Sequence, residues 1–340
     1  MFINRGPASA ANHLLQSAYI RLHAEPIHVP PGMTQVFPDS TVLAPKDPLA
    51  VLISFVPPPL LVSQVPSTLM TRWVPAEDLF MKLKDAVAIV TGSSSGIGAA
   101  IARALAEQGC HVVINYSRND AGARAVATEC EALGVRVLVQ KANVAEDDDC
   151  RALVEATVAR FGRLDVLINN AGTTQFCAHE NLAGLDKQDF LDLYAVNTIG
   201  PFQMTRAAEA ALRAQPIAHV INMASIAGLA GVGSSIAYAA SKGALLTLTK
   251  SLARVLGPQV RVNAVCPGFV QGEWLEKGLG KERYGKILDQ TRATAPLNDT
   301  ATPETVAQIV LGLLIGGDLT TGESLLVDGG AHLNSGVPRR

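Results

Sequence analysis

The sequence has few aromatic residues and no concentration of charge of one sign. Aromatic side chains make up 5% of its 340 residues, and 28 basic residues stand against 30 acidic ones, for a net charge of −2. Binding to nucleic acid requires Lys and Arg side chains gathered on one surface, where they neutralise phosphates. No basic stretch of that kind is present, so we expect no nucleic-acid partner.

Cysteines and long apolar runs are also scarce. The five cysteines lie far apart, with no CxxC pair and no spacing typical of metal ligands: Cys110, Cys130, Cys150, Cys177 and Cys266. We therefore expect reduced thiols, no metal site and a cytoplasmic protein. The longest apolar stretch, residues 49–62, is interrupted by three prolines. A transmembrane helix needs about 18 or more apolar residues, so we expect no membrane span.

Residues 1–80 differ in composition from the rest and contain most of the 19 prolines. Prolines remove backbone donors and block helix interiors, which predicts a largely irregular or disordered extension. It could be an organelle-targeting peptide, an interaction arm, or the result of a start codon assigned too far upstream. We favour the third, because Met81 to Asp85 leads directly into the first expected strand. The predicted organisation is this extension, one domain over 81–334 and a tail at 335–340.

From residue 85 onward, short apolar runs alternate with stretches that favour helix. Strands are expected at 86–91, 111–115, 135–140, 165–169, 218–223, 260–265 and 324–327, and helices at 99–108, 120–133, 146–161, 187–214, 236–256 and 303–315. Continuous apolar runs are typical of strands that are buried on both faces. Their alternation with helices predicts an α/β protein with a single doubly wound parallel sheet, the Rossmann fold.

A glycine-rich turn, Thr91-Gly92-Ser93-Ser94-Ser95-Gly96-Ile97-Gly98, joins the first strand to the first helix. Such a turn directs backbone N–H groups and a helix N-terminus at a phosphate. Gly92 can adopt a positive φ, Gly96 allows the backbone to approach a pyrophosphate, and Gly98 allows close packing of helix and strand. The turn therefore predicts a dinucleotide site, with Ser94, Ser95 and Ile97 beside the glycines.

The end of the second strand bears on the choice of cofactor, and it reads Tyr116-Ser117-Arg118 with no acidic residue. An acidic residue there would bind a ribose 2′-hydroxyl, whereas Arg118 can pair with a 2′-phosphate and Ser117 can donate to it. We expect NADP(H) to be preferred and NAD(H) to be possible. The alternative is that Arg118 is an ordinary solvated charge in a loop.

Two further loops are expected at the cofactor. Asn143-Val144, after the third strand, is placed to border the adenine. Asn170-Ala171-Gly172, after the fourth strand, would form the floor beneath the nicotinamide ribose.

Tyr238 and Lys242 are four residues apart and so lie on one face of a helix. A nearby ammonium favours the phenolate, so we expect Lys242 to lower the pKa of Tyr238 and make it a general acid/base. Ser225 follows an apolar run 13 residues before the tyrosine. The alternatives are a chance pair on a solvated helix and a serine that only caps a strand.

In combination these motifs resemble the short-chain dehydrogenase/reductase family, and in particular the 3-oxoacyl-(acyl-carrier-protein) reductases. The resemblance covers residues 83–330 and rests on Thr91-Gly92-x-x-x-Gly96-x-Gly98, Asn169-Asn170-Ala171-Gly172, Asn197, Ser225, Tyr238-x-x-x-Lys242, Pro267-Gly268 and Asp328-Gly329-Gly330.

The resemblance implies that a carbonyl and a secondary alcohol are interconverted by hydride transfer from or to a nicotinamide. Tyr238 would exchange the proton, Lys242 would lower its pKa and bind the ribose, and Ser225 would hold the substrate oxygen. Asn197 would position a water that relays protons to Lys242. The resemblance also implies that Pro267, Gly268 and Val270 line the cofactor site, and that the protein is a homodimer or homotetramer.

Three positions depart from the family pattern: Asn143 replaces a common aspartate, Gly272 a common threonine, and Ser95 an arginine of many NADP-preferring members. Residues 269–301 are expected to cap a small-molecule substrate whose identity stays open. Two other functions also stay open. One is a non-catalytic dinucleotide sensor or scaffold, and the other is an epimerase or dehydratase with a tightly held cofactor, whose relatives usually have a larger C-terminal domain.

Overall fold

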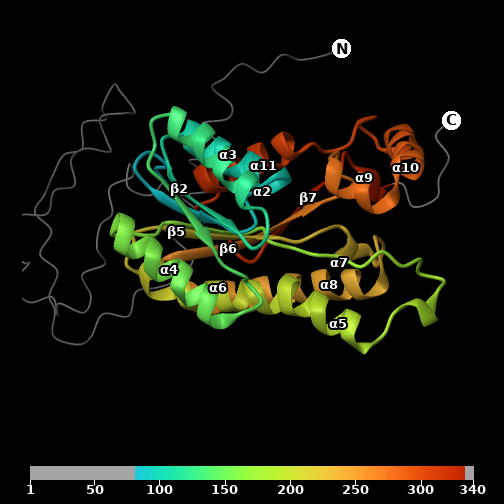
Figure 1. Cartoon of the computed structure of the whole chain (residues 1–340), viewed down its shortest axis with the longest axis horizontal. Coiled ribbons are helices and arrows are strands. Elements are labelled where there is room, and N and C mark those ends of the chain that lie inside the picture. The colour runs from blue at the N-terminus through green and yellow to red at the C-terminus, as the bar shows by residue number, and fades with distance from the viewer. Residues whose placement is uncertain (1–80, 334–340) are drawn as a thin grey trace, which may run out of the picture. The chain divides into compact units, whose positions relative to one another are not determined.

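The fold is organised around one parallel β-sheet of seven strands (Figure 1). The structure is a computed structural model that describes residues 81–333, so the interpretations of residues 1–80 and of the tail lie outside the described residues. The strands are β1 (Val87–Val90), β2 (His111–Tyr116), β3 (Val137–Lys141), β4 (Val166–Asn169), β5 (Ala218–Met223), β6 (Val260–Pro267) and β7 (Ser324–Val327). Their spatial order is β3-β2-β1-β4-β5-β6-β7, which confirms the predicted doubly wound sheet.

Helices cover both faces of the sheet, as the apolar strands require. One face is covered by α2 (Gly96–Glu107), α3 (Asp120–Ala132) and α11 (Pro303–Gly316), and the other by α4 (Asp147–Phe161), α6 (Gly200–Arg213) and α8 (Ile236–Leu256). None of the helices formed by residues 81–333 is both long and apolar enough to cross a membrane. Within the same residues, no group of three or more His, Cys, Asp or Glu side chains is arranged to hold a metal ion.

The single helix predicted over residues 187–214 is three segments. These are α5 (Lys187–Tyr194), the π-helical turn η6 (Ala195–Ile199) and α6. Pro201, in the first turn of α6, has no N–H and cannot donate to the carbonyl of Asn197 four residues earlier. The wider turn accommodates this missing bond and buries Asn197 completely.

Two short helices, α9 (Glu273–Leu279) and α10 (Lys281–Thr294), form the predicted cap between β6 and α11. Aromatic contacts hold the cap in place. The rings of Phe176 and Trp274 have centroids 6.3 Å apart, and those of Phe269 and Tyr284 are 5.4 Å apart. The loop after β4 therefore packs on α9 through Phe176, which also approaches the bare backbone of Gly278.

At the amino end of β5, His219 is fully buried, and neither ring nitrogen has a hydrogen-bond partner. Burial, aided by the Arg261 charge, lowers the pKa of His219 to about 4. The imidazole is therefore uncharged at neutral pH, and its 4.0 Å approach to the Asp318 carboxylate is not an ion pair.

Candidate active site

The glycine turn leads from β1 into α2 and leaves open space over the first turn of the helix. Gly92 and Gly96 have φ values of 62° and 57°, in the left-handed region that glycine tolerates. A Cβ on Gly96 would meet no atom within 4 Å, whereas one on Gly98 would lie 2.4 Å from the Asn170 Nδ2. Gly98 thus allows close packing, while Gly96 leaves accessible the first N–H groups of α2, which have no partner inside the helix.

The floor of the site is tied to the glycine turn through Thr91. The Thr91 hydroxyl accepts from the backbone N–H groups of Asn170 and Ala171, each at 3.0 Å. The Asn170 amide donates to the carbonyls of Thr91 at 2.9 Å and Gly92 at 3.1 Å. A Cβ on Gly92 would lie 2.9 Å from the Ala171 Cα, so only glycine permits this approach. The ends of β1 and β4 therefore form one rigid unit.

Tyr116, the last residue of β2, is half-buried, and the loop that follows begins with Ser117 and Arg118, which are exposed. Asp120, the first residue of α3, accepts from the Arg124 Nε at 2.7 Å through its Oδ2, and its Oδ1 is buried without a hydrogen-bond partner among the described residues. The Arg124 contact, aided by the nearby Tyr116 hydroxyl, holds the pKa of Asp120 below its usual range. One oxygen of this carboxylate is thus bound by Arg124, and the other is buried.

The remaining cofactor candidates follow β3 and β6. Asn143 is exposed, and its side-chain oxygen accepts from the Ala145 N–H at 3.2 Å, while Val144 is buried. At the end of β6, a Cβ on Gly268 would lie 2.6 Å from the Asp328 Cβ, so β6 and β7 approach closely there. Val270 pairs with Ala301 in an isolated bridge below the cap.

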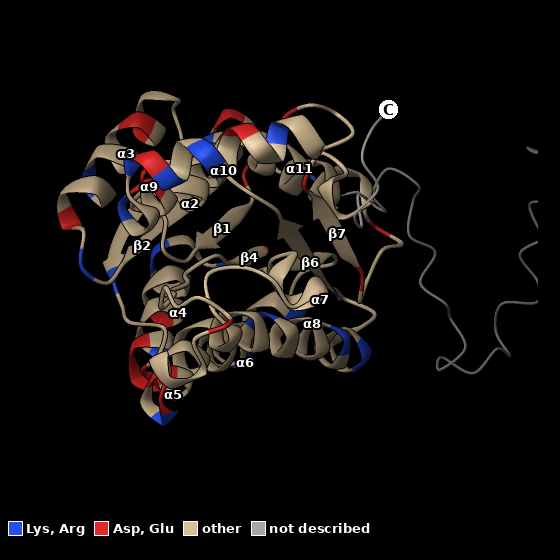
Figure 2. Ribbon diagram, turned by 90° about the vertical axis from the view of Figure 1, so that its right-hand side faces the viewer, with Lys and Arg blue, Asp and Glu red and all other residues tan. Residues whose placement is uncertain are grey.

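All of these residues follow the carboxyl ends of parallel strands, and such ends meet at one edge of a sheet. Pro267, the last residue of β6, and Gly172, beyond β4, belong to the same edge. Figure 2 views this edge of the molecule.

Ser225, Tyr238 and Lys242 meet at this edge. Ser225 follows β5, and Tyr238 lies in the first turn of α8, where its N–H donates to the Ser235 cap at 3.2 Å. The Tyr238 hydroxyl lies beside the Ser225 side chain, and this contact acts to lower the tyrosine pKa. One turn later, the buried Lys242 Nζ donates to the Met223 carbonyl at 2.8 Å and lies 5.8 Å from the centre of the Tyr238 ring. The three side chains form one connected group.

Asn197 completes the group from the π-helical turn. Its Nδ2 donates to the Thr173 carbonyl and to the Ser241 hydroxyl, both at 3.0 Å, and its Oδ1 accepts from the Thr173 N–H at 2.9 Å. A Cβ on Gly172 would lie 3.4 Å from this Oδ1 and 3.7 Å from the Lys242 Nζ. Asn197 and Lys242 therefore lie close to each other, on either side of the Gly172 backbone.

Burial dominates the ionisation of the two titratable groups. It raises the pKa of Tyr238 to about 12, although the contact with the Ser225 side chain acts in the opposite direction. It lowers the pKa of Lys242 to about 8, against the effect of the Cys266 thiol. The sequence predicted a lowered tyrosine pKa, and the structure shows the opposite direction. The reason is that desolvation disfavours the phenolate, and the ammonium donates to Met223 rather than to the phenol.

Sequence reasoning missed three residues that support the site. They are Thr91, which binds the floor loop; Asn115, whose side chain accepts from the Gly92 N–H at 3.1 Å; and Ser241, which holds Asn197. Ser241 lies between Tyr238 and Lys242 in the sequence. A polar residue on the buried side of that helix was the signal from which its role could have been predicted. The partners of Thr91 and Asn115 lie 79 and 23 residues away, and no local pattern reveals such contacts.

The chemistry of this edge fits a nicotinamide dinucleotide. The space over Gly96 and the unpaired N–H groups of α2 suit a pyrophosphate, which helix N-termini bind well. Gly172 has no side chain beside the Lys242 Nζ, so a ribose can lie there and accept a hydrogen bond from the lysine. Groups suited to the pyrophosphate and to the nicotinamide ribose of a dinucleotide thus lie along one edge of the sheet.

Comparison with known proteins agrees with this geometry. A family model described as enoyl-(acyl carrier protein) reductase matches residues 92–332. The chain is 44% identical over 248 residues to ketoacyl reductase 2 of the granaticin polyketide synthase from Streptomyces violaceoruber, covering 73% of this chain and 96% of that one. It is 35% identical over 247 residues to a 3-oxoacyl-(acyl-carrier-protein) reductase of Staphylococcus aureus, covering 72% and 98%.

A solved structure is also similar. It is a short-chain dehydrogenase/reductase from Burkholderia xenovorans, with a TM-score of 0.68 and 40% identity over 73% of this chain and 98% of that one. The matched family model covers the region that holds Gly92, Gly96 and Gly98 and the Ser225, Tyr238 and Lys242 group. The chain therefore belongs to the short-chain dehydrogenase/reductase family of NAD(P)-binding oxidoreductases.

Proposed function

We propose that the chain is an NADP(H)-preferring reductase that interconverts a ketone and a secondary alcohol, with Tyr238 as the proton donor and acceptor. The observation that carries the proposal is the placement of the Tyr238 hydroxyl beside the Ser225 side chain, one helical turn from the buried Lys242. A sensor or scaffold would need the glycine turn but would have no use for a proton-transfer group at the far end of the site.

The bound nicotinamide would supply or accept the hydride. Ser225 and Tyr238 would both donate to the carbonyl oxygen, which stabilises the negative charge that develops there. Tyr238 would then transfer its proton to that oxygen, and Asn197 and Lys242 would lie on the route by which the proton is replaced. A phenol is protonated at neutral pH, and burial raises its pKa further, so the free protein would hold Tyr238 in the acid form that reduction requires.

Two features support a preference for NADP(H). Arg118 and Ser117 are exposed beyond β2, where a 2′-phosphate could accept from them. Asp120, the acidic residue close by, has its Oδ2 bound by Arg124 and its Oδ1 buried, so neither oxygen is exposed to accept from a ribose 2′-hydroxyl. NAD(H) would then bind more weakly, because it lacks the phosphate.

For the substrate we propose a 3-oxoacyl group, the class that the names of the two relatives indicate. The segment after Ser225, which includes α7 (Ala227–Ala230), carries no charged side chain. In Figure 2 the Lys, Arg, Asp and Glu residues lie mainly on the outer helices, including α3, α5, α9 and α10. Phe176 and Trp274 would border an apolar entrance beside the cap.

We also propose a homodimer or homotetramer in the cytoplasm. Two separate surfaces expose large apolar side chains: Leu191, Ile199 and Phe202 on the α5–α6 segment, and Ile315, Leu319 and Leu325 around β7, which is an edge strand. Exposed apolar patches of this kind mark association sites. Four of the five cysteines are buried free thiols, which suits a reducing compartment. Sedimentation analysis of the full chain would test the association.

The test of the catalytic assignment is Tyr238→Phe in the full chain. Removing the general acid should lower turnover of a 3-oxoacyl thioester by about 100-fold or more, while NADPH affinity stays unchanged. Tyr194→Phe, at the end of α5, is the matched control and should keep full activity. Normal turnover by Tyr238→Phe would remove the tyrosine from the mechanism. Tight NADPH binding by the unmutated chain, with no turnover of any ketone, would favour the sensor.

A further inference from the structure

The loop expected to border the adenine, residues 142–146, is held in place from two sides. We call it the adenine loop. On the α4 side, the Asn143 N–H donates to the Asp149 carboxylate at 2.7 Å, and the Cys150 thiol donates to the Val144 carbonyl at 3.4 Å. Asn143 is exposed and Val144 is only 5% exposed, so the loop presents one residue outward and anchors the next.

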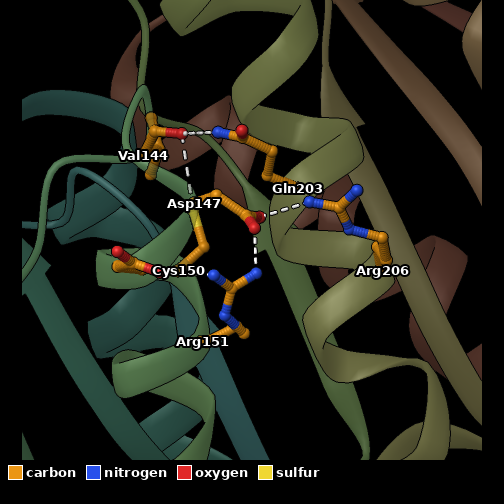
Figure 3. A network of polar contacts seen from close by, with 7 residues as sticks. Val144, Asp147, Cys150, Arg151, Gln203 and Arg206 are labelled. Carbon is orange, nitrogen blue, oxygen red and sulfur yellow. Dashed lines mark hydrogen bonds and ion pairs between the residues drawn. The ribbon is translucent and has the colours of Figure 1, made fainter.

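On the other side, the loop contacts α6. The Gln203 Nε2 donates to the Val144 carbonyl at 3.0 Å (Figure 3). A Cβ on Gly200, the first residue of α6, would lie 2.9 Å from the Val144 Cγ2 and 3.1 Å from its carbonyl oxygen. The backbone of Gly200 therefore lies directly against the loop, and Gln203, one turn further along α6, provides the polar contact.

A second link joins the start of α4 to α6. Asp147, the first residue of α4, is bound by Arg206 of α6 and by Arg151 of its own helix (Figure 3). The hydrogen bond from Arg206 is the main reason that the pKa of Asp147 lies below its usual range. The Arg206 guanidinium also lies 5.4 Å from the centre of the Phe202 ring. The two links together clamp the adenine loop and the N-terminus of α4 onto one helix.

The same helix is fixed to the catalytic group. It continues directly from the π-helical turn, whose Asn197 donates to Ser241 and whose Thr198 hydroxyl donates to the Ser241 carbonyl at 3.0 Å. Gln203 thus follows Asn197 by six residues on a segment anchored to α8. Displacement of α6 would move the adenine loop and the catalytic asparagine together.

From these contacts we infer that Gln203 is a positioning residue for the adenine half of the cofactor, an inference that rests on the proposed cofactor site. Gln203 touches neither substrate nor any reacting atom. Without its amide, the buried Val144 carbonyl keeps only the weak thiol donor of Cys150, and the loop is free to shift from the position that the adenine requires. The effect should therefore appear in binding of the adenine end and not in the chemical step.

The test uses Gln203→Met in the full chain, because methionine keeps the length and removes the donor. NADPH affinity, followed by fluorescence, should fall about 5- to 10-fold, which corresponds to one net hydrogen bond. Reduced nicotinamide mononucleotide, which lacks the adenine, should bind the variant and the parent equally. With a 3-oxoacyl thioester, the KM for NADPH should rise and kcat should stay the same.

Two further variants sharpen the test. Gln203→Lys restores a donor at similar reach and should recover most of the affinity. Gln215→Met is the matched control, because Gln215 donates to the Ala211 carbonyl of the same helix segment and has no contact with the loop. It should leave both affinities unchanged.

The outcomes separate this inference from the proposed function. Unchanged NADPH affinity in Gln203→Met would overturn the inference and leave the reductase assignment intact. Equal weakening of NADPH and the mononucleotide would also overturn it, because the residue would then support the whole site. If the unmutated chain bound neither NADPH nor NADH, the proposed function would fail, and the positioning role would fail with it.

Discussion

Replacing Lys242 by methionine should stabilise the protein at neutral pH while abolishing turnover. The side chain is 5% exposed, and burial lowers its pKa from 10.5 to about 8. This lowering of the pKa corresponds to about 3 kcal/mol, which is the cost of burying the ammonium below pH 8. Losing the hydrogen bond to the Met223 carbonyl costs about 1 kcal/mol, so the net gain is about 2 kcal/mol. The melting temperature should rise by about 5 °C.

The pH dependence gives the sign of this effect. Below pH 8 the lysine is protonated in both the folded and the unfolded protein, so the cost of burial is fully present. Between pH 8 and 10.5 the folded protein loses this proton while the unfolded chain keeps it, so the stability of the parent rises with pH. The advantage of Lys242→Met should therefore shrink as pH rises and should have disappeared by pH 10.5, where the lost hydrogen bond to Met223 outweighs the remaining cost of burial.

Urea unfolding of the full chain without cofactor, at pH 7 and at pH 10.5, measures both values. Lys250→Met is the matched control, because Lys250 is exposed on the same helix and should change stability little. A loss of stability that is the same at both pH values would refute the reasoning, since it would mean that Lys242 is not a buried, destabilised charge.

Three other outcomes are expected. Arg118→Ala should weaken NADPH about 10-fold and leave NADH unchanged in a fluorescence titration; equal losses would argue against a 2′-phosphate contact. Gly278→Ala would place a Cβ 2.0 Å from the Phe176 ring and should cost about 1–3 kcal/mol of stability and raise the substrate KM, whereas Gly285→Ala, with no atom within 4 Å of its Cβ, should do neither. Because burial lowers the folded pKa of His219 to about 4, stability should fall as pH drops from 6.5 to 4, and His219→Leu should flatten that decline.

The sheet and the glycine turn could be predicted because their signals are local. Apolar runs such as that of β1 mark strands buried on both faces, and the spacing of Gly92, Gly96 and Gly98 identifies the turn between strand and helix. The Tyr238 and Lys242 pair was visible for the same reason, since helical spacing fixes which side chains share a face.

The environment of these residues could not be predicted in the same way. The tyrosine pKa moves upward because the surrounding fold desolvates the phenol, and burial is a property of the whole fold rather than of a four-residue spacing. The break between α5 and α6 was missed because the apolar and helix-favouring pattern runs through it. Only Pro201 marked the position, and proline is tolerated in the first turn of a helix.

The π-helical turn implies that α5 and α6 are out of phase by one residue. A turn closed by bonds from i to i+5 contains one residue more than an α-helical turn. Deleting one residue from Ala195–Ile199 would change the direction of every side chain on one side of the deletion by about 100°, and Pro201 would still interrupt the backbone hydrogen bonds there. Asn197 would then face away from Thr173 and Ser241. The extra residue of the π-helical turn, and not the choice of asparagine alone, therefore places the Asn197 amide in its buried position beside Thr173 and Ser241.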